Sequence, residues 1–252
     1  MSFPLLKLDW VGHDAAKFAC EHWHYSKVTP VGKLNACGVW ENEKFIGCVL
    51  FSYGANNNMA GEYHLNQTEC IELTRIALNS HLTPVTKIAS IAIKMVRKLN
   101  PFLKLIVSYA DANMGHYGII YQGGNWIYVG TTKADGGQTI NGKVMHRRSV
   151  FSKYGTNSTE ILRNNGIDAS FIKCKPKYKY LYPLTDDMRL KIEPLRKPYP
   201  KKTDKGALVV HSVSTPVIHT GEEGSIPIPT HMIENKDTFP GKEIRLIQDG
   251  GK

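Results

Sequence analysis

The densest group of titratable side chains in the sequence is His22-Trp23-His24-Tyr25-Ser26-Lys27. An imidazole such as that of His24 can take a proton from an attacking amine near neutral pH, and the Tyr25 phenol can return one to a leaving group. Two histidines two residues apart could also bind a metal ion, but no third ligand is evident nearby in the sequence. The stretch therefore predicts either a reactive site or the amphipathic end of a surface helix.

A second candidate is Asp111, which follows a near-continuous apolar run over residues 103–108. Such a run is typical of a central strand covered on both faces, and substrates of open α/β sheets lie at the carboxyl edge of these strands. A carboxylate there can orient an imidazole or accept a hydrogen bond from an exocyclic base amine; the alternative is a cap for the next helix. Tyr117 and Tyr121 lie four apart in the short helix predicted over residues 116–122, so both phenols would share one face.

A loop that joins a strand predicted over residues 70–78 to the start of a long helix could bind an anion. We expect Thr83 to cap this helix and Pro84 to fill its first position, where a missing N–H costs nothing. Free N–H groups of the first turn could then hold a phosphate, together with the Thr83 and Thr86 hydroxyls and the Lys87 amine. The alternative is simply a well-capped helix.

The rest of the pattern predicts the elements that position these groups. Apolar spacing from Asp14 to His22 predicts a short helix with Asp14 as its cap. Residues 38–40 and 45–51 flank a polar turn and predict a β-hairpin. From residue 69 to residue 132 the chain reads strand, long helix, strand, short helix and strand, which indicates a parallel β-α-β unit. A further helix is predicted near residues 158–164. We therefore expect an α/β (α+β) fold with a mixed central sheet and flanking helices.

The positive charge of the chain is concentrated in one block. The formal net charge is +10, and residues 133–202 alone hold 16 Lys and Arg against 6 Asp and Glu. A localised excess of this kind indicates a polyanionic partner, nucleic acid above all, and the alternative is a solvated basic surface. Tyrosines that alternate with lysines near residue 180 are expected to pack inward rather than to stack on bases. The candidate phosphate ligands of the block are Arg147, Arg148, Lys173, Lys175, Lys177 and Lys179.

Composition argues against several classes of protein. No apolar run approaches the roughly 20 residues that span a bilayer, and the N-terminal residues lack the charged start and apolar centre of a signal peptide. The five cysteines form no Cys-x-x-Cys pair, so we expect reduced thiols of an intracellular protein rather than zinc ligands. We expect neither a membrane partner nor a bound metal. At 252 residues the chain can bury one substantial core.

Together these stretches resemble the phage Mom family of DNA-modifying proteins, which is related to the GNAT acyltransferase fold. The resemblance runs from near residue 20 to near residue 200 and is most specific between Gly115 and Thr132. It rests on His24-Tyr25-Ser26-Lys27, Gly38-Val39-Trp40-Glu41-Asn42, Glu72-Leu73-Thr74-Arg75, Thr83-Pro84-Val85, Ser108-Tyr109-Ala110-Asp111, Gly115-His116, Gly118-Ile119-Ile120-Tyr121-Gln122-Gly123-Gly124-Asn125-Trp126-Ile127-Tyr128 and Gly130-Thr131-Thr132.

The resemblance implies an enzyme that converts adenine in phage DNA to a carbamoylmethyl (methylcarbamoyl) form, which protects the DNA from host restriction endonucleases. It implies action in the host-cell cytoplasm during infection. It also implies a GNAT-like catalytic core over residues 1–155. The charge block predicts a basic extension over residues 156–200 that packs on the core and contacts double-stranded DNA, and the lack of periodic pattern predicts a loosely structured tail over residues 201–252. By position, the catalytic residues would be His24, Tyr25, Asp111 and Tyr121; the donor-binding residues Arg75, His81, Thr83, Val85, Thr86 and Lys87; and the DNA-binding residues Ser26, Lys27, Ser108, His116, Arg147, Arg148, Lys173, Lys175 and Lys177.

The donor of the transferred group stays open. GNAT enzymes usually carry a glycine-containing Gln/Arg-x-x-Gly-x-Gly/Ala loop, whereas this chain has Ser80-His81-Leu82-Thr83-Pro84-Val85. Acetyl-coenzyme A would leave an acetyl amide with no terminal nitrogen, while a glycyl donor such as glycyl-tRNA carries all the atoms of the product. An iron-assisted route, with Tyr25 and Asp111 as ligands, is a further option for which the sequence offers few ligands.

Two other functions and the oligomeric state also stay open. The rivals to a DNA-modifying enzyme are a non-catalytic nucleic-acid-binding protein on the same scaffold and a protein N-acetyltransferase. The charge block disfavours the second of these, since a basic surface suits a polyanion better than a protein substrate. A homodimer is one option for the assembly.

Overall fold

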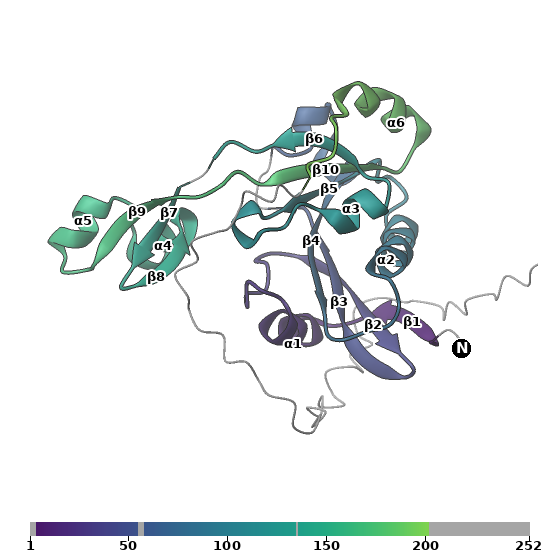
Figure 1. Ribbon diagram of the computed structural model, residues 1–252, viewed down its shortest axis with the longest axis horizontal. Coiled ribbons are helices and arrows are strands. Elements are labelled where there is room, and N and C mark those ends of the chain that lie inside the picture. Colours follow the sequence, from purple (N-terminus) through teal and green to yellow (C-terminus); the bar gives the residue numbers. More distant parts are fainter. Residues whose placement is uncertain (1–3, 55–57, 135, 202–252) are drawn as a thin grey trace, which may run out of the picture.

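The computed structural model describes residues 4–54, 58–134 and 136–201. Within these residues the central sheet has seven strands in the order β1-β2-β3-β4-β5-β10-β6, and all neighbours are antiparallel except β4 and β5. The mixed central sheet with flanking helices is therefore confirmed (Figure 1). The predicted tail lies outside the described residues, apart from Lys201. The strands are β1 (Leu6–Trp10), β2 (Leu34–Glu41), β3 (Lys44–Ser52), β4 (Cys70–Leu78), β5 (Leu105–Ala110), β10 (Tyr178–Pro183) and β6 (Ile127–Thr131).

Two helices cover the two faces of this sheet, α1 (His13–Trp23) and α2 (Val85–Leu99). Side chains alternate along β3, so that Leu50 packs with the alanines of α1 while Phe51 packs with the buried face of α2. The predicted hairpin is confirmed as β2 and β3, joined at two residues with positive φ that match the right-handed twist of the strands. The expected Asp14 cap is wrong, because Gly12 is the N-cap and Asp14 lies in the first turn, where its charge suits the helix dipole.

The β4-α2-β5 unit is parallel only at its start. The last pair of the parallel ladder between β4 and β5 joins Glu72 to Val107. β4 nevertheless continues to Leu78 beside β3, and β5 continues to Ala110 beside β10. The two strands therefore diverge toward their carboxyl ends, and side chains of other elements fill the opening.

Strand β10 comes from the segment that the sequence assigned to the basic extension. Residues 178–183 therefore do not merely pack on the core but form a strand of it, between β5 and β6. Tyr180 is fully buried, as expected for an inward-facing tyrosine. Lys179 is wrong as a phosphate ligand: it is buried, its amine donates to Glu62 Oε2 at 2.5 Å, and it lies 4.9 Å from the centre of the Tyr63 ring.

A smaller three-stranded sheet, β8-β7-β9, projects from the central sheet at the left of Figure 1. Its core contains Ile140, Val150, Leu162 and Ala169. The helix predicted at residues 158–164 is confirmed, with the Ser158 hydroxyl as its N-cap. We call this unit the basic module; it contains β7 (Gly136–Ile140), β8 (Lys143–His146), α4 (Arg147–Tyr154), α5 (Thr159–Asn164) and β9 (Ala169–Lys173).

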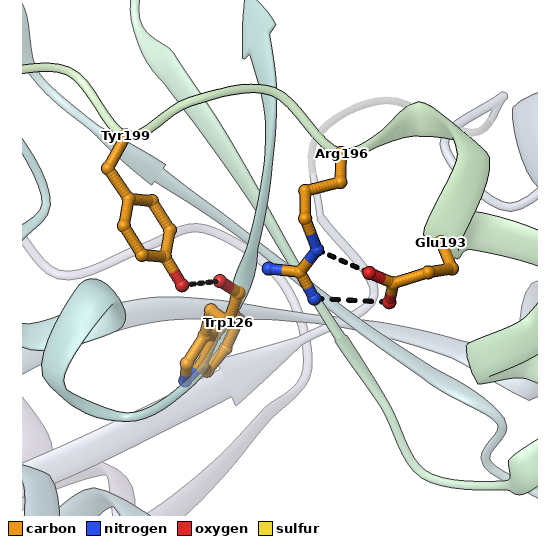
Figure 2. A network of polar contacts seen from close by, with 4 residues as sticks. All are labelled: Trp126, Glu193, Arg196 and Tyr199. Atoms are coloured by element: carbon orange, nitrogen blue, oxygen red, sulfur yellow. Dashed lines mark hydrogen bonds and ion pairs between the residues drawn. The ribbon is translucent and has the colours of Figure 1, made fainter.

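The last described residues cross back over the central sheet. After α6 (Asp186–Ile192), Glu193 forms an ion pair with Arg196, and the Tyr199 hydroxyl donates to the Trp126 carbonyl at 2.7 Å (Figure 2). The Tyr199 contact and a hydrogen bond from the Lys197 N–H to the Tyr128 carbonyl, at 2.8 Å, hold this segment against β6. Among the described residues, no helix has the length and apolar character that a membrane span requires.

Candidate active site at the divergence of β4 and β5

Buried hydroxyl groups occupy the opening between β4 and β5. Ser108 on β5 is fully buried, and its hydroxyl lies 2.7 Å from both the Leu73 carbonyl oxygen and the Tyr121 hydroxyl. A hydroxyl has one proton and a carbonyl can only accept, so Tyr121 donates to Ser108 when Ser108 donates to Leu73. Tyr121 comes from α3 (Ile119–Gly123), and burial raises its pKa to about 12. It is therefore a neutral phenol at physiological pH.

The end of α1 brings two rings to the same opening. The His24 ring is 4.2 Å from the Tyr25 ring, and Tyr25 meets His116 edge-on at 5.0 Å, measured between ring centroids. His24 is buried, whereas Tyr25 is 42% exposed. Burial, and next the charge of Asp111, raises the pKa of Tyr25, so its phenol stays protonated and can donate. The stretch therefore brings two rings to this opening, and its reading as a reactive site stays a prediction.

The protonation of His24 is set by its surroundings. His24 Nδ1 lies 2.7 Å from the Ser26 hydroxyl and 3.2 Å from the Ser26 backbone nitrogen. A backbone N–H can only donate, so Nδ1 is the acceptor of that hydrogen bond, and the proton of the neutral ring is then on Nε2. Burial, followed by the positive charges of Arg75, His116 and Lys27, lowers the pKa of His24 to about 4. The ring is therefore neutral at physiological pH, and its free nitrogen is a hydrogen-bond donor rather than a base.

Asp111 follows β5 directly and faces this group. Its Oδ1 accepts hydrogen bonds from the backbone and side-chain nitrogens of Asn113, at 2.9 and 3.0 Å, and so caps the short 3₁₀ helix Ala112–Met114. The alternative reading as a cap is confirmed, and the role in binding or catalysis stays a prediction, for which Oδ2 is available because it has no bond to any described residue.

Arg75 is the cationic centre of the site. The pairing of β3 with β4 shifts register between Leu50 and Phe51, and this bulge turns Arg75 to the side of the sheet that carries Glu72 and α1. Its Nη1 donates to the Thr74 carbonyl at 2.7 Å, while its buried Nε has no partner among the described residues. The guanidinium acts on the pKa of His24, Tyr25 and Glu72, which places all three groups close to it.

The predicted anion-binding loop is already filled by a carboxylate of the chain itself. Buried Glu41 accepts hydrogen bonds from the Leu82 N–H, the Thr83 N–H and the Thr83 hydroxyl, at 2.8, 2.8 and 2.6 Å. The expected Thr83 cap is wrong, because Pro84 is the N-cap of α2 and the Thr83 hydroxyl points to Glu41. The N–H and hydroxyl protons of Thr83 are therefore committed to Glu41 and not to a donor. His81 is held in the same way by the Asn79 carbonyl, at 2.7 Å.

Replacing Glu41 by glutamine is expected to lower the free energy of unfolding by about 1–3 kcal/mol, since a neutral amide cannot accept all three hydrogen bonds. Burial alone would raise the pKa of Glu41, but the hydrogen bonds from Thr83 and Leu82 bring it below its ordinary value. The stabilisation is therefore present near neutral pH and is lost as the pH falls through the lowered pKa. Urea unfolding at pH 7 and pH 3 measures both effects. Glu43→Gln, on the adjacent exposed turn, is the control and should have little effect.

Comparison with known proteins identifies the family of the chain. The model of the Mom protein family matches residues 5–201. The chain belongs to the Mom protein family. A curated relative, methylcarbamoylase mom of Escherichia phage Mu, is 24% identical over 131 residues, which cover 50% of this chain and 54% of the relative. The match therefore spans about half the length of that protein. A solved structure of a candidate acetyltransferase from Acinetobacter baylyi ADP1 covers 79% of this chain and 99% of its own, with a TM-score of 0.40 and 9% identity.

The fold of this Mom-family chain brings most of the predicted catalytic residues together. His24, Tyr25, Asp111 and Tyr121 share one site: Asp111 acts on the pKa of Tyr25, and Tyr25 on that of Tyr121. Arg75 joins them from the predicted donor set. The remaining donor residues, Val85 and Thr86, lie half-buried in the first turn of α2, and Lys87 is exposed there.

The predicted DNA-binding residues fall into four places. Ser108 and His116 lie in the candidate active site itself, against Tyr121 and Tyr25. Ser26 and exposed Lys27 follow α1, where the Lys27 amine donates to the His22 carbonyl at 2.7 Å. Lys175 and Lys177 lie on the connection from the basic module to β10, and Asn113 holds that connection through the Lys175 N–H at 2.8 Å. The others lie on the basic module: Arg147 and Lys173 are exposed at the start of α4 and the end of β9, and the side chain of Arg148 lies outside what the structure describes.

Sequence reasoning missed one member of the site, Glu72. Burial raises the pKa of this carboxyl, while Arg75 and Lys177 oppose the rise. It lies opposite Gly54, where an added Cβ would come within 2.7 Å of Glu72 Oε2. The available signal was its polar position on β4, three residues before Arg75.

The residues of the site do not fit a metal held by three His, Cys, Asp or Glu side chains. No such group of three occurs among the residues that the structure describes. Tyr25 and Asp111 lie near each other, but the neighbouring His24 uses Nδ1 as an acceptor for Ser26. We therefore derive no step through iron.

Proposed function

We propose that this Mom-family protein is a DNA-modifying transferase that converts adenine in phage DNA to carbamoylmethyl adenine and so protects it from host restriction endonucleases. The observation that carries the proposal is the convergence of Asp111, Tyr25 and Arg75 at the divergence of β4 and β5, directly beside the basic connection at Lys175. The name of the phage Mu relative supports it. We place its action in the cytoplasm of the infected host.

In the proposed reaction the exocyclic amine of adenine attacks the carbonyl carbon of an acyl donor. Asp111 Oδ2 accepts the amine proton as the new N–C bond forms. The Arg75 guanidinium stabilises negative charge on the carbonyl oxygen, helped by the Nε2–H of His24. Tyr25 returns a proton to the leaving group as the bond from the carbonyl carbon to that group breaks, and Tyr121 with Ser108 holds the opening in shape.

A glycyl ester, for example glycyl-tRNA, is the donor that we favour over acetyl-coenzyme A. Glycyl transfer gives the amide C6–NH–C(O)–CH2–NH2, which has the same atoms as the carbamoylmethyl product C6–NH–CH2–C(O)–NH2. In the rearrangement the glycyl amine attacks C6 of adenine, the bond from C6 to the original amine nitrogen breaks, and that nitrogen becomes the carboxamide, so no other reagent is consumed. Acetyl transfer lacks the nitrogen. The Glu41 carboxylate also occupies the loop donors that a coenzyme pyrophosphate would otherwise use. Labelled glycine should label the modified adenine, and incorporation of labelled acetate instead would overturn this choice.

Adenine must leave the duplex stack to reach the site, which costs a few kcal/mol that contacts to the DNA backbone have to offset. We assign these contacts to the basic module. Between residues 136 and 177 the chain has eight Lys and Arg and two Asp and Glu. The module projects from the central sheet, so a duplex bound there can lie across the opening that holds Asp111 (Figure 1).

The double variant Arg147→Gln/Lys173→Gln is expected to bind duplex DNA about tenfold more weakly and to reduce the slope of log affinity against log salt by nearly two, because each lost phosphate contact removes about 0.9 from that slope. Fluorescence anisotropy over a salt series measures both quantities. Lys17→Gln/Lys44→Gln removes the same charge on exposed positions of α1 and β3 and should change neither by much. Equal effects of the two double variants would mean that the module is not the DNA-binding surface.

Mass spectrometry of nucleosides from cells that express the protein tests the proposed function directly. A carbamoylmethyl adenine should appear only with active protein. The rival function, a non-catalytic nucleic-acid-binding protein on the same scaffold, predicts DNA binding with no altered adenine. A protein N-acetyltransferase predicts acetylated protein and unmodified DNA.

A further inference from the structure

A second positively charged site lies between α2 and α6. The two helices enclose a cleft of about 290 Å³, which also borders the end of β10. This volume approaches the lower end of the range for small-molecule sites. Its polar lining consists of Ser90, Lys94, Arg97, Tyr182, Thr185, Asp186 and Arg189. Three cations against one carboxylate favour an anionic ligand.

Two cations of this cleft, Lys94 and Arg97, have no charged partner among the residues that the structure describes. Within residues 4–54, 58–134 and 136–201, neither Lys94 nor Arg97 forms an ion pair or a hydrogen bond through its side chain. The charge of Arg189 interacts with Glu193, but the Glu193 carboxylate already forms an ion pair with Arg196 (Figure 2). The Arg97 guanidinium therefore keeps its forked set of donors, which suits a phosphate.

The same charge continues along α2 toward the reactive site. Lys87, Lys94 and Arg97 are seven and three residues apart, which places them on one face of the helix. α2 contains no Asp or Glu. Its fifteen residues span about 22 Å. Its first turn is next to α3, because an added Cβ on Gly123 would meet the Thr86 side chain at 3.3 Å. The row of cations formed by Lys87, Lys94 and Arg97 therefore extends from the cleft toward α3, the helix that carries Tyr121.

The cleft lies far from both the reactive site and the basic module. Pro183 in its lining pairs with Leu105 at the start of β5, whereas Asp111 follows the other end of that strand, about 17–20 Å away. In Figure 1, α2 and α6 lie at the end of the molecule opposite to the module. A ligand that binds the cleft through a phosphate and also reaches Asp111 must therefore be long enough to extend along α2, and it does not overlap DNA bound on the module.

We propose that the α2–α6 cleft binds a phosphate group of the acyl donor, whose reactive end reaches the divergence of β4 and β5 along α2. The proposal rests on the proposed function, since it assigns this site to the second substrate of the transfer. A phosphate-bearing donor can be an RNA or a coenzyme. An RNA strand carries a phosphate at every nucleotide and can contact both the cleft and Lys87.

The test compares Lys94→Gln/Arg97→Gln with Lys98→Gln/Lys191→Gln, which removes two exposed charges from the same helices outside the cleft. Anisotropy or calorimetry with full-length protein measures binding of unfractionated tRNA, coenzyme A and a DNA duplex. We expect the cleft variant to bind one of the first two at least about tenfold more weakly, with DNA affinity changed less than about twofold, because each charge-assisted contact is worth roughly a factor of ten. The probe affected identifies the source of the phosphate.

Three outcomes would overturn the proposal: equal losses in the two double variants, loss of DNA affinity in the cleft variant, or no loss with any probe. The first would show a general effect of charge and the second a DNA-binding surface. The thermal midpoint of each variant should match that of the unmodified protein, as both pairs of side chains are exposed. Nucleoside mass spectrometry with the unmodified protein decides the proposed function independently: modified adenine without an effect of the cleft variant refutes only the cleft, and no modified adenine at all refutes the transferase.

Discussion

Replacing Asp111 by asparagine is expected to reduce the yield of modified adenine at least about 100-fold, while the affinity for duplex DNA changes less than about twofold. Asparagine keeps an oxygen that can accept from the Asn113 N–H, so the cap of the 3₁₀ helix Ala112–Met114 survives. It cannot take a proton from the adenine amine. The variant therefore separates proton transfer from the local fold.

Quantitative mass spectrometry of nucleosides and an anisotropy titration give the two readouts. Asp187→Asn, on an exposed position of α6 outside the cleft, is the control for loss of one carboxylate and should retain modification. Near-normal modification in Asp111→Asn would exclude the carboxylate as the proton acceptor. A parallel loss of DNA affinity would instead make Asp111 part of the nucleic-acid contact through Asn113 and the Lys175 backbone.

The parts of the site that follow from local chain order could be predicted from the sequence. The apolar run that becomes β5 places Asp111 at a strand end, and the end of α1 carries the His24-Tyr25 pair. Both depend on contacts between near neighbours in the chain. The hairpin of β2 and β3 and the capped helix α5 were predictable for the same reason.

Features that depend on contacts between residues far apart in the chain could not be predicted from the sequence. The position of β10 between β5 and β6 depends on partners that are roughly 50 to 70 residues away, so a basic stretch looked like an extension. The Glu41 carboxylate reaches Leu82 and Thr83 from 41 and 42 residues upstream and turns a predicted phosphate site into an internal hydrogen-bond network. No local pattern indicates either contact.

The orientation of Arg75 is the most consequential of these effects. Strict alternation along β4 would put Arg75 on the side of Ile71 and Leu73, inside the apolar core under α2. The bulge opposite Leu50 and Phe51 reverses the side from that point, so Arg75 meets Glu72 and the rings at the end of α1. A one-residue irregularity in the sheet thus brings the charge to the site.

Replacing Arg75 by glutamine is therefore expected to reduce modification by about 100- to 1,000-fold, the usual effect of removing a donor that stabilises charge in the transition state. The same variant should raise the pKa of His24 above its value of about 4, because after burial the guanidinium is the largest cause that holds it down. Two-dimensional NMR of the imidazole protons during an acid titration measures this shift. It reports on the site even when no substrate is present.

The lowered pKa of His24 should also make the stability of the protein depend on pH, and Arg75→Gln should weaken that dependence. Since the folded pKa of His24 lies below its ordinary value of 6.5, the unfolded chain binds the proton first, and the unmodified protein loses stability as the pH falls from 6.5 toward 4. Arg75→Gln narrows that interval and should lose less over it. Arg75→Lys keeps a positive charge without the planar fork, so it should leave the pKa of His24 low while modification stays impaired. If Arg75→Lys restores modification fully, charge alone is sufficient; if Arg75→Gln leaves both the pKa and modification unchanged, the guanidinium is not part of the site.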